Sequence, residues 1–258
     1  MADDQVARFY DELAEDYHLI FADWRQSVAR QGVVLDRLIR ERLGDADDPR
    51  SVLDCACGIG TQAIGLAQRG YTMTGTDLSA DAVDRARTEA DRAGVTVDLA
   101  VADMRAVDTV AGSGYAAAIC CDNSLPHLLL DGDLATALTA IRRCLAPGAP
   151  FVATIRDYDD LAARKPSGTD PQLLRDENGK RRVVGQAWEW NEDIIDVMLF
   201  ILIEDGDRWS SSVREMQYRA WRREELDAAL GRAGFSGPTW MFPEATGYYQ
   251  PIVVARAE

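Results

Sequence analysis

The chain has 258 residues, of which 47% are apolar and 28% are charged, and its formal net charge is −15. This composition is typical of a soluble globular enzyme with one domain, or one domain and an insertion. The sequence contains no run of 18 apolar residues, so no membrane-spanning helix is expected. The acidity disfavours nucleic acids as partners, because DNA and RNA repel such a surface and no basic stripe offsets it.

The first 50 residues are expected to form a helical cap. Apolar residues recur at helical spacing over residues 5–20 and 26–43, which predicts two amphipathic helices. Residues 44–50 are acidic and contain a proline, so they predict a loop. The start of the chain lacks the basic and apolar regions of a signal peptide, and we therefore expect a cytoplasmic protein.

Residues 51–160 predict a core in which short buried strands alternate with helices. Such alternation is typical of parallel strands in an α/β, doubly wound, Rossmann-like sheet. The strands are expected at 51–55, 71–77, 95–102, 115–121 and 150–155. The helices are expected at 61–68, 80–93 and 134–145.

The rhythm changes in residues 161–222, which we interpret as an inserted lid that binds the acceptor. Prolines, glycines and charges over residues 164–182 predict a long loop. Antiparallel strands are expected around residues 183–184, 194–203 and 211–218, with a hairpin turn at 204–207. Residues 223–258 are expected to complete the core with a helix at 223–233 and strands at 239–242 and 251–256.

The five cysteines are expected to be small buried apolar residues rather than disulfides or metal ligands. Their number is odd, no CxxC pair exists, and only two histidines are available for a metal site. The sequence therefore predicts no metal. The cysteines are Cys55, Cys57, Cys120, Cys121 and Cys144.

A glycine-containing loop, Asp54 to Gly60, joins the first predicted strand to the first helix of the core. Gly58 and Gly60 let the backbone approach a ligand without a Cβ clash. The stretch Gly58 to Ala63 also fits GxGxxA, the dinucleotide fingerprint, which is a weak signal by itself.

Acidic residues follow three successive strands. Asp54 lies beside the glycine loop, where a sulfonium and an ammonium group need acidic neighbours. Asp77 ends the second strand, where a carboxylate can accept hydrogen bonds from ribose hydroxyls. Asp103 and Met104 end the third strand and suit the amino group and the face of an adenine. A solvated strand end is the alternative for each acid taken alone.

This ordered set resembles the class I S-adenosylmethionine-dependent methyltransferases, with Asp54 to Gly60 as their glycine motif. The resemblance implies a seven-stranded sheet with the last strand antiparallel, and S-adenosylmethionine as cofactor. Two further stretches, Asn123-Ser124-x-x-His127 and Ile155 to Asp159, are similar to glycine N-methyltransferases.

The similarity to glycine N-methyltransferases implies roles residue by residue. Arg156 would hold the acceptor's carboxylate, and Asn123 would line its pocket. A salt bridge to Asp157 or Asp159 is the alternative for Arg156, and a capping role is the alternative for His127. The implied cofactor contacts are Tyr10, Tyr17, Arg25, Ala56, Asp77, Leu78, Asp103, Met104, Cys121 and His127.

The lid departs from that family. It contains Trp188-Glu189-Trp190 where glycine N-methyltransferases have tyrosines, which puts glycine in doubt and favours a larger or aromatic amine between tryptophan walls. Packing of both tryptophans in a core is the alternative. Tyr248 and Tyr249 have no assigned role.

We therefore expect a methyltransferase for a small molecule, acting by in-line displacement on the amine of an amino acid or a related carboxylated amine. Glu189 and Asp122 are the two candidates for a general base. The alternatives are an O- or C-methyltransferase of a natural product, an NAD-dependent oxidoreductase and a non-catalytic cofactor-binding module. The sequence leaves open whether the chain forms a homo-oligomer.

Overall fold

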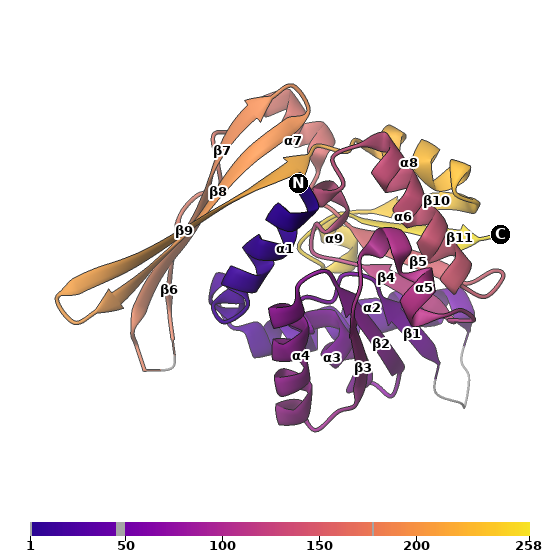
Figure 1. Ribbon diagram of the computed structural model, residues 1–258, viewed down its shortest axis with the longest axis horizontal. Coiled ribbons are helices and arrows are strands. Elements are labelled where there is room, and N and C mark those ends of the chain that lie inside the picture. Colours follow the sequence, from indigo (N-terminus) through magenta and orange to yellow (C-terminus); the bar gives the residue numbers. More distant parts are fainter. Residues whose placement is uncertain (1, 45–49, 177) are drawn as a thin grey trace.

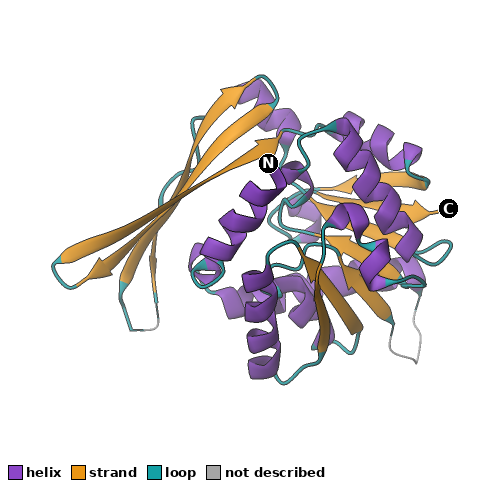
Figure 2. Ribbon diagram, in the orientation of Figure 1, coloured by secondary structure: helices purple, strands orange, loops and turns teal. Residues whose placement is uncertain are grey.

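A computed structural model of the chain describes residues 2–44, 50–176 and 178–258. The described residues form two β-sheets and the helices around them (Figures 1 and 2). Residues 45–49 of the predicted loop 44–50 lie outside the described residues.

The main sheet has seven strands in the order β10-β11-β5-β4-β1-β2-β3. Strand β11 pairs antiparallel with its neighbours β10 and β5, and strands β1 to β5 pair parallel with one another. This confirms the predicted Rossmann-like sheet with its last strand antiparallel. The strands are β1 (Ser51–Asp54), β2 (Thr72–Asp77), β3 (Val97–Val101), β4 (Ala117–Cys120), β5 (Pro150–Thr154), β10 (Phe235–Met241) and β11 (Ile252–Ala257).

Helices cover both faces of the main sheet because side chains alternate along its buried strands. In β1, Val52 packs with Leu35 and Leu66 on one face, whereas Leu53 packs in a cluster with Leu138 and Leu230 on the other. The first face carries α2 (Trp24–Leu43), α3 (Thr61–Ala67) and, toward its edge, α4 (Ala80–Ala93). The second face carries α5 (Asp108–Ala111), α6 (Asp131–Cys144) and α8 (Arg223–Arg232).

Short helices complete the connections of the main sheet at its edges. They are the 3₁₀ turns η2 (Met104–Ala106) and η3 (Leu125–His127), and the helices α7 (Tyr158–Arg164) and α9 (Pro243–Thr246). All five cysteines are buried and free, as predicted.

The second sheet is antiparallel, extends away from the main sheet and has the order β6-β7-β8-β9 (Figure 1). Its strands are β6 (Gln172–Arg175), β7 (Arg181–Asn191), β8 (Ile194–Asp205) and β9 (Arg208–Arg219). The predicted loop 164–182 is wrong in part, because β6 lies within it and pairs with β7 along the register Leu173–Val183. Strand β6 lies at the edge of its sheet, and three of its four residues are exposed. The fourfold division of the chain stays a prediction.

The predicted single helix over residues 5–20 is also wrong. Helix α1 (Ala2–Leu13) ends in a turn, and a separate 3₁₀ turn η1 (Tyr17–Ile20) follows. Glu15 and Asp16 come at the negative end of α1, where acidic side chains are unfavourable. In addition, the guanidinium of Arg182 binds the carbonyl oxygens of Leu19 (2.8 Å) and Phe21 (2.6 Å), which draws η1 toward β7.

Helix α1 lies between the two sheets (Figure 1). Phe9 and Leu13 join the apolar cluster that includes the inner face of the lid strands. None of the helices in residues 2–44, 50–176 and 178–258 has both the length and the apolar character needed to span a membrane.

Candidate active site

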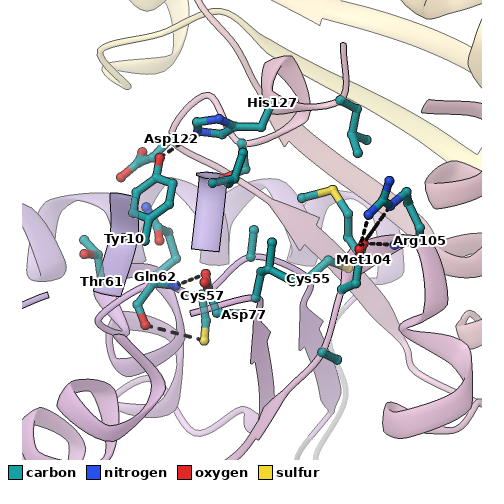
Figure 3. Close-up of a pocket in the computed structure, with 18 of the residues that line it drawn as sticks. Tyr10, Cys55, Cys57, Thr61, Gln62, Asp77, Met104, Arg105, Asp122 and His127 are labelled. Carbon is teal, nitrogen blue, oxygen red and sulfur yellow. Dashed lines mark hydrogen bonds and ion pairs between the residues drawn. The ribbon is translucent and has the colours of Figure 1, made fainter. Parts of the chain in front are cut away.

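A pocket opens at the carboxyl ends of β1 to β4, beneath α1 and η1 (Figure 3). Open α/β sheets bind ligands at this edge. The lining includes nine residues that the sequence singled out for cofactor binding. They are Tyr10, Tyr17, Ala56, Gly58, Asp77, Leu78, Asp103, Met104 and His127.

Four other candidates lie outside this lining. Arg25 is exposed at the start of α2, and Cys121 is buried in the cluster between the sheet and α2 and α3. Gly60 caps α3, and Asp54 is fully buried directly below the loop. The structure therefore brings neither Arg25 nor Cys121 to the pocket, although the resemblance implied a contact for each.

The two glycines of the loop have different reasons for being glycine. At Gly58, with φ of 51°, an added Cβ would meet no protein atom within 4 Å, so bare backbone faces the pocket. At Gly60, with φ of 90°, a Cβ would lie 3.0 Å from Cδ1 of Ile64. Gly58 thus leaves room for a ligand, whereas Gly60 lets α3 begin close to its neighbours.

Asp77 holds the loop and faces the pocket. Its Oδ2 accepts a hydrogen bond from the backbone N–H of Gly58 (2.8 Å), and its Oδ1 accepts one from that of Ser79 (3.0 Å). Each carboxylate oxygen can accept a further bond. Asp77 is therefore fixed in orientation while keeping acceptor capacity for hydroxyl groups.

Asp54 carries an orphaned atom. Its Oδ1 accepts a bond from the N–H of Ala56 (3.3 Å), whereas the buried Oδ2 has no partner among the described residues. Burial, with smaller contributions from Asp77 and Asp122, raises the pKa of Asp54 to about 8. Burial also raises the pKa of Asp77 and of Asp122. Buried acids that repel one another favour a cationic ligand between them.

Asp103, which the sequence offered to the amino group of an adenine, already binds Arg105 in the structure. Its carboxylate pairs with the guanidinium of Arg105 and accepts a bond from the Arg105 backbone N–H (2.8 Å). Partial burial would raise the pKa of Asp103, but these Arg105 contacts hold it below the usual value. The carboxylate stays ionised beside Met104, and Arg105 also lines the pocket.

Two side-chain hydrogen bonds hold helix α1 over the pocket. The hydroxyl of Tyr10 lies 2.8 Å from Nε2 of His127, and Oδ1 of Asp11 accepts a bond from Ser79 Oγ (2.6 Å). Burial, together with the charge of Arg156, lowers the pKa of His127 to about 4. His127 is therefore neutral at pH 7 and can form its bond with Tyr10 without burying a charge.

A second pocket joins the first and extends beneath the lid sheet. Tyr10, Tyr17 and Asp122 line both pockets. Asn123 and Arg156, for which the resemblance implied contacts with the acceptor, line the second pocket. The two pockets together can place two small molecules side by side at the end of the sheet.

Arg156 is held firmly but is incompletely paired. Its Nη2 donates to Oε1 of Gln186 (3.0 Å), and its guanidinium carbon lies 4.9 Å from the ring centre of Trp188 and 5.4 Å from that of Tyr218. Its buried Nη1 has no hydrogen-bond partner among the described residues. An unpaired buried donor of a cation is costly unless a ligand satisfies it.

The alternative salt bridge for Arg156 is wrong. Asp157 and Asp159 both pair with Arg223, at 2.6 Å and 3.2 Å. Asn123 supports Arg156 from behind, because its Oδ1 accepts the backbone N–H of Arg156 (3.1 Å) and its Nδ2 donates to the hydroxyl of Tyr158 (2.9 Å).

The tryptophans predicted to form walls around the acceptor do not line the second pocket. Trp188 is buried behind Arg156, and the indole N–H of Trp190 donates to the carbonyl of Pro166 (2.8 Å). Neither ring lines the pocket. Glu189 is exposed, outside both pockets, whereas Asp122 lies where they meet. The structure thus favours Asp122 over Glu189 as the candidate base.

The sequence missed a group of polar residues before β11. Tyr248 and Tyr249 both donate hydrogen bonds to Asp122, and Gln250 accepts one from Thr154 Oγ1 (2.9 Å). An antiparallel last strand begins at the edge where its parallel neighbours end. That topology was the available signal for this segment.

In the described part of the chain, no cluster of three or more His, Cys, Asp or Glu side chains suits a metal ion.

Comparisons with known proteins agree with this architecture. A methyltransferase domain family matches residues 52–148. A Bacillus subtilis protein that carries the name methyltransferase YqeM is 26% identical over 187 residues, which are 71% of this chain and 72% of that protein. A glycine/sarcosine N-methyltransferase of Parasynechococcus marenigrum is 29% identical over 139 residues, 54% of this chain and 48% of the relative, so the match spans about half of that enzyme.

A solved structure extends the similarity to both sheets. The S-adenosylmethionine-bound amino pentose methyltransferase from Micromonospora echinaspora, involved in calicheamicin biosynthesis, has a TM-score of 0.75 at 22% identity. The match covers 90% of this chain and 92% of that one.

Proposed function

We propose that this chain, a class I S-adenosylmethionine-dependent methyltransferase, methylates the amine of a small acceptor that also carries a carboxylate. The observation that carries the acceptor class is Arg156, whose buried Nη1 lacks a partner in a pocket continuous with the cofactor pocket. A guanidinium binds a carboxylate through two parallel hydrogen bonds. The NAD-dependent alternative has no support from the matched family.

The cofactor pocket fits S-adenosylmethionine by charge and by shape. The unpaired Oδ2 of Asp54 and the raised pKa values of Asp54 and Asp77 favour a ligand that brings positive charge. The bare backbone at Gly58 leaves room for it. Asp77 would accept the ribose hydroxyls, Met104 would contact the adenine face, and Tyr10 and Tyr17 would cover the bound molecule.

The reaction needs alignment more than acid–base chemistry. The bound cofactor supplies a methyl group on a sulfonium, and the neutral thioether that departs is a good leaving group. Arg156 would hold one end of the acceptor while Asn123 keeps the Arg156 backbone in place. Alignment of two reactants in an attack geometry can lower a barrier by roughly 7–11 kcal/mol.

The named relatives support an amine as the acceptor group. One is named for glycine and sarcosine, and the other for an amino pentose. Both kinds of acceptor contain an amine, whereas a carboxylate belongs to the first kind. The carboxylate in our proposal rests on Arg156 and not on the relatives.

An acceptor screen tests the proposed function. Purified protein with S-adenosylmethionine would be incubated with amino acids, N-methylated amino acids, amino sugars without a carboxylate, and phenols. We expect release of S-adenosylhomocysteine and a product one methyl group heavier, with the new methyl on nitrogen, for acceptors with both an amine and a carboxylate. Turnover confined to phenols or to uncharged amino sugars would contradict the acceptor class.

Asp77→Ala tests the cofactor half of the site. Loss of hydrogen bonds from hydroxyls to this carboxylate should weaken S-adenosylmethionine binding by about 1.5–3 kcal/mol, the range for bonds to charged groups. Calorimetric titration measures the effect. Asp98→Ala is a matched control, because Asp98 is an exposed acid of the adjacent strand β3. Wild-type affinity in Asp77→Ala would refute the assignment.

A further inference from the structure

Asp122 stands at the junction of the two pockets on a turn with unusual backbone geometry. Asp122 and Asn123 have φ angles of 56° and 69°, in the left-handed region that few residues other than glycine adopt. The turn is held by the end of β5, because the Asp122 N–H donates to Thr154 Oγ1 (2.8 Å) and the Asn123 N–H to the Thr154 carbonyl (3.1 Å). Asp and Asn adopt this region more readily than other residues with a side chain, and the contacts with Thr154 hold the turn in it.

Two tyrosines before β11 fix the carboxylate of Asp122. The hydroxyl of Tyr248 lies 2.8 Å from Oδ1, and that of Tyr249 lies 2.5 Å from the same oxygen. The two rings are stacked with their centres 5.1 Å apart. Both bonds fall on one oxygen, and Oδ2 takes no part in them. Gln62 and Gln31 also hydrogen-bond to this carboxyl group. The carboxylate is therefore held in one orientation, and it lines both pockets.

The surroundings of Asp122 favour its protonated form. Burial raises its pKa, and the hydrogen bonds from Tyr249 and Tyr248 offset this in part. The titratable groups that face it are Asp54 from β1, Tyr17 from η1, Cys121 beside it, and the two tyrosines. None of these neighbours is a cation. A base with a raised pKa accepts a proton near neutral pH better than an ordinary carboxylate does.

We infer that Asp122 binds the ammonium group of the acceptor and takes one proton from it before methyl transfer. This inference rests on the proposed function, and it names the base that an amine acceptor requires, because an ammonium has no lone pair for attack.

The proton and electron balance is complete. One N–H bond of the ammonium breaks, its proton moves to the Asp122 carboxylate, and the electron pair stays on nitrogen. That pair forms the new N–C bond to the methyl group, while the C–S pair leaves with sulfur. The product is a methylated ammonium, and the Asp122 carboxyl then loses its proton to solvent.

Asp122→Asn is the test, because asparagine tolerates the same backbone region and still accepts hydrogen bonds from both tyrosines. The probes are glycine, sarcosine and the other amino acids, and the one with the highest wild-type kcat/KM is used. We expect kcat/KM at pH 7 to fall about 100-fold, within the range for general-base catalysis. The dissociation constant of S-adenosylmethionine should change by less than about threefold, since a factor of three is under 1 kcal/mol.

The pH profile separates a base from a structural residue. At pH values below the pKa of the amine, each rise of one pH unit makes the free amine about tenfold more abundant. The loss of kcat/KM in Asp122→Asn relative to wild type should therefore shrink about tenfold for each such unit. A deficit that is the same at every pH would overturn the inference, and so would a lost cofactor affinity or unchanged kinetics. Asp98→Asn should match wild type throughout. If wild type methylates no amine at all, the proposed function itself fails, and the inference fails with it.

Discussion

Asp54→Asn is expected to weaken S-adenosylmethionine binding and, at the same time, to stabilise the ligand-free protein. The wild-type carboxylate would face a cationic ligand from below the glycine loop, with its Oδ2 unpaired. Removal of one partner from a buried charge pair costs about 2–5 kcal/mol of binding energy. Asparagine keeps the shape of the side chain but lacks its charge. Calorimetric titration measures the loss.

The stability gain follows from the pKa of Asp54. Its folded-state pKa is about 8, above the ordinary value of 3.8, so ionisation favours the unfolded chain. Ionisation of Asp54 therefore lowers the stability of wild type as pH rises from the lower value toward the higher one, and the variant lacks this contribution. Between pH 6 and 8 the difference in Tm should grow by roughly 3 °C per pH unit.

Asp98→Asn is the control for Asp54→Asn, because Asp98 is an exposed acid of β3, the edge strand of the main sheet. It should change neither the affinity for S-adenosylmethionine nor the pH dependence of Tm. Wild-type affinity in Asp54→Asn would contradict the role of Asp54 toward the cofactor. A Tm difference that does not depend on pH would contradict the buried, protonated state of the free protein. The two measurements are independent, so either part of the account can fail alone.

Arg156→Lys is expected to lower kcat/KM for the acceptor, largely through a higher acceptor KM. The loss should correspond to about 1.5–3 kcal/mol of transition-state binding, the range for hydrogen bonds to charged groups. Lysine keeps the positive charge but cannot form the two parallel bonds that a guanidinium makes with a carboxylate. Nor can it stack as a flat group between Trp188 and Tyr218. Cofactor affinity should stay at the wild-type level, because Arg156 lines the acceptor pocket and not the cofactor pocket.

Steady-state kinetics with the best acceptor from the screen, together with calorimetry, test Arg156→Lys. Arg181→Lys is a matched control, because Arg181 also stands over a tryptophan, Trp209, at 5.5 Å and belongs to the lid sheet, but it lines neither pocket. Unchanged acceptor kinetics in Arg156→Lys would remove the carboxylate from the proposed function. Equal decreases in kcat/KM for acceptors with and without a carboxylate would also remove the carboxylate from the proposed function.

Periodicity in the sequence located the five strands expected within residues 51–160, whereas the strand expected at 239–242 begins earlier, at Phe235. Strands such as Ser51–Asp54 and Pro150–Thr154 are short apolar runs bounded by loops, and burial on both faces makes that pattern unambiguous. The same reasoning failed for residues 5–20, where apolar spacing continues past Leu13. Helix α1 ends there because of acidic residues and because Arg182, more than 160 positions away, binds the next carbonyls. A contact across that separation leaves no trace in local spacing.

The candidate site divides in the same way. Asp77, Gly58 and Asp103 follow predicted strands, so their place at one edge of the sheet could be predicted from topology. The partners of Arg156 could not, because Gln186 and Tyr218 come from lid strands whose register no local pattern specifies. Asp122 and Tyr249 meet only because β11 runs antiparallel to β5.

Titration of S-adenosylmethionine into the purified protein, with NAD as the control ligand, tests the central claim most directly. We expect micromolar, enthalpically driven binding of S-adenosylmethionine at one site per chain and no binding of NAD. Absence of S-adenosylmethionine binding, or binding of NAD in its place, would contradict the assignment of the Gly58 loop, and with it the methyltransferase account.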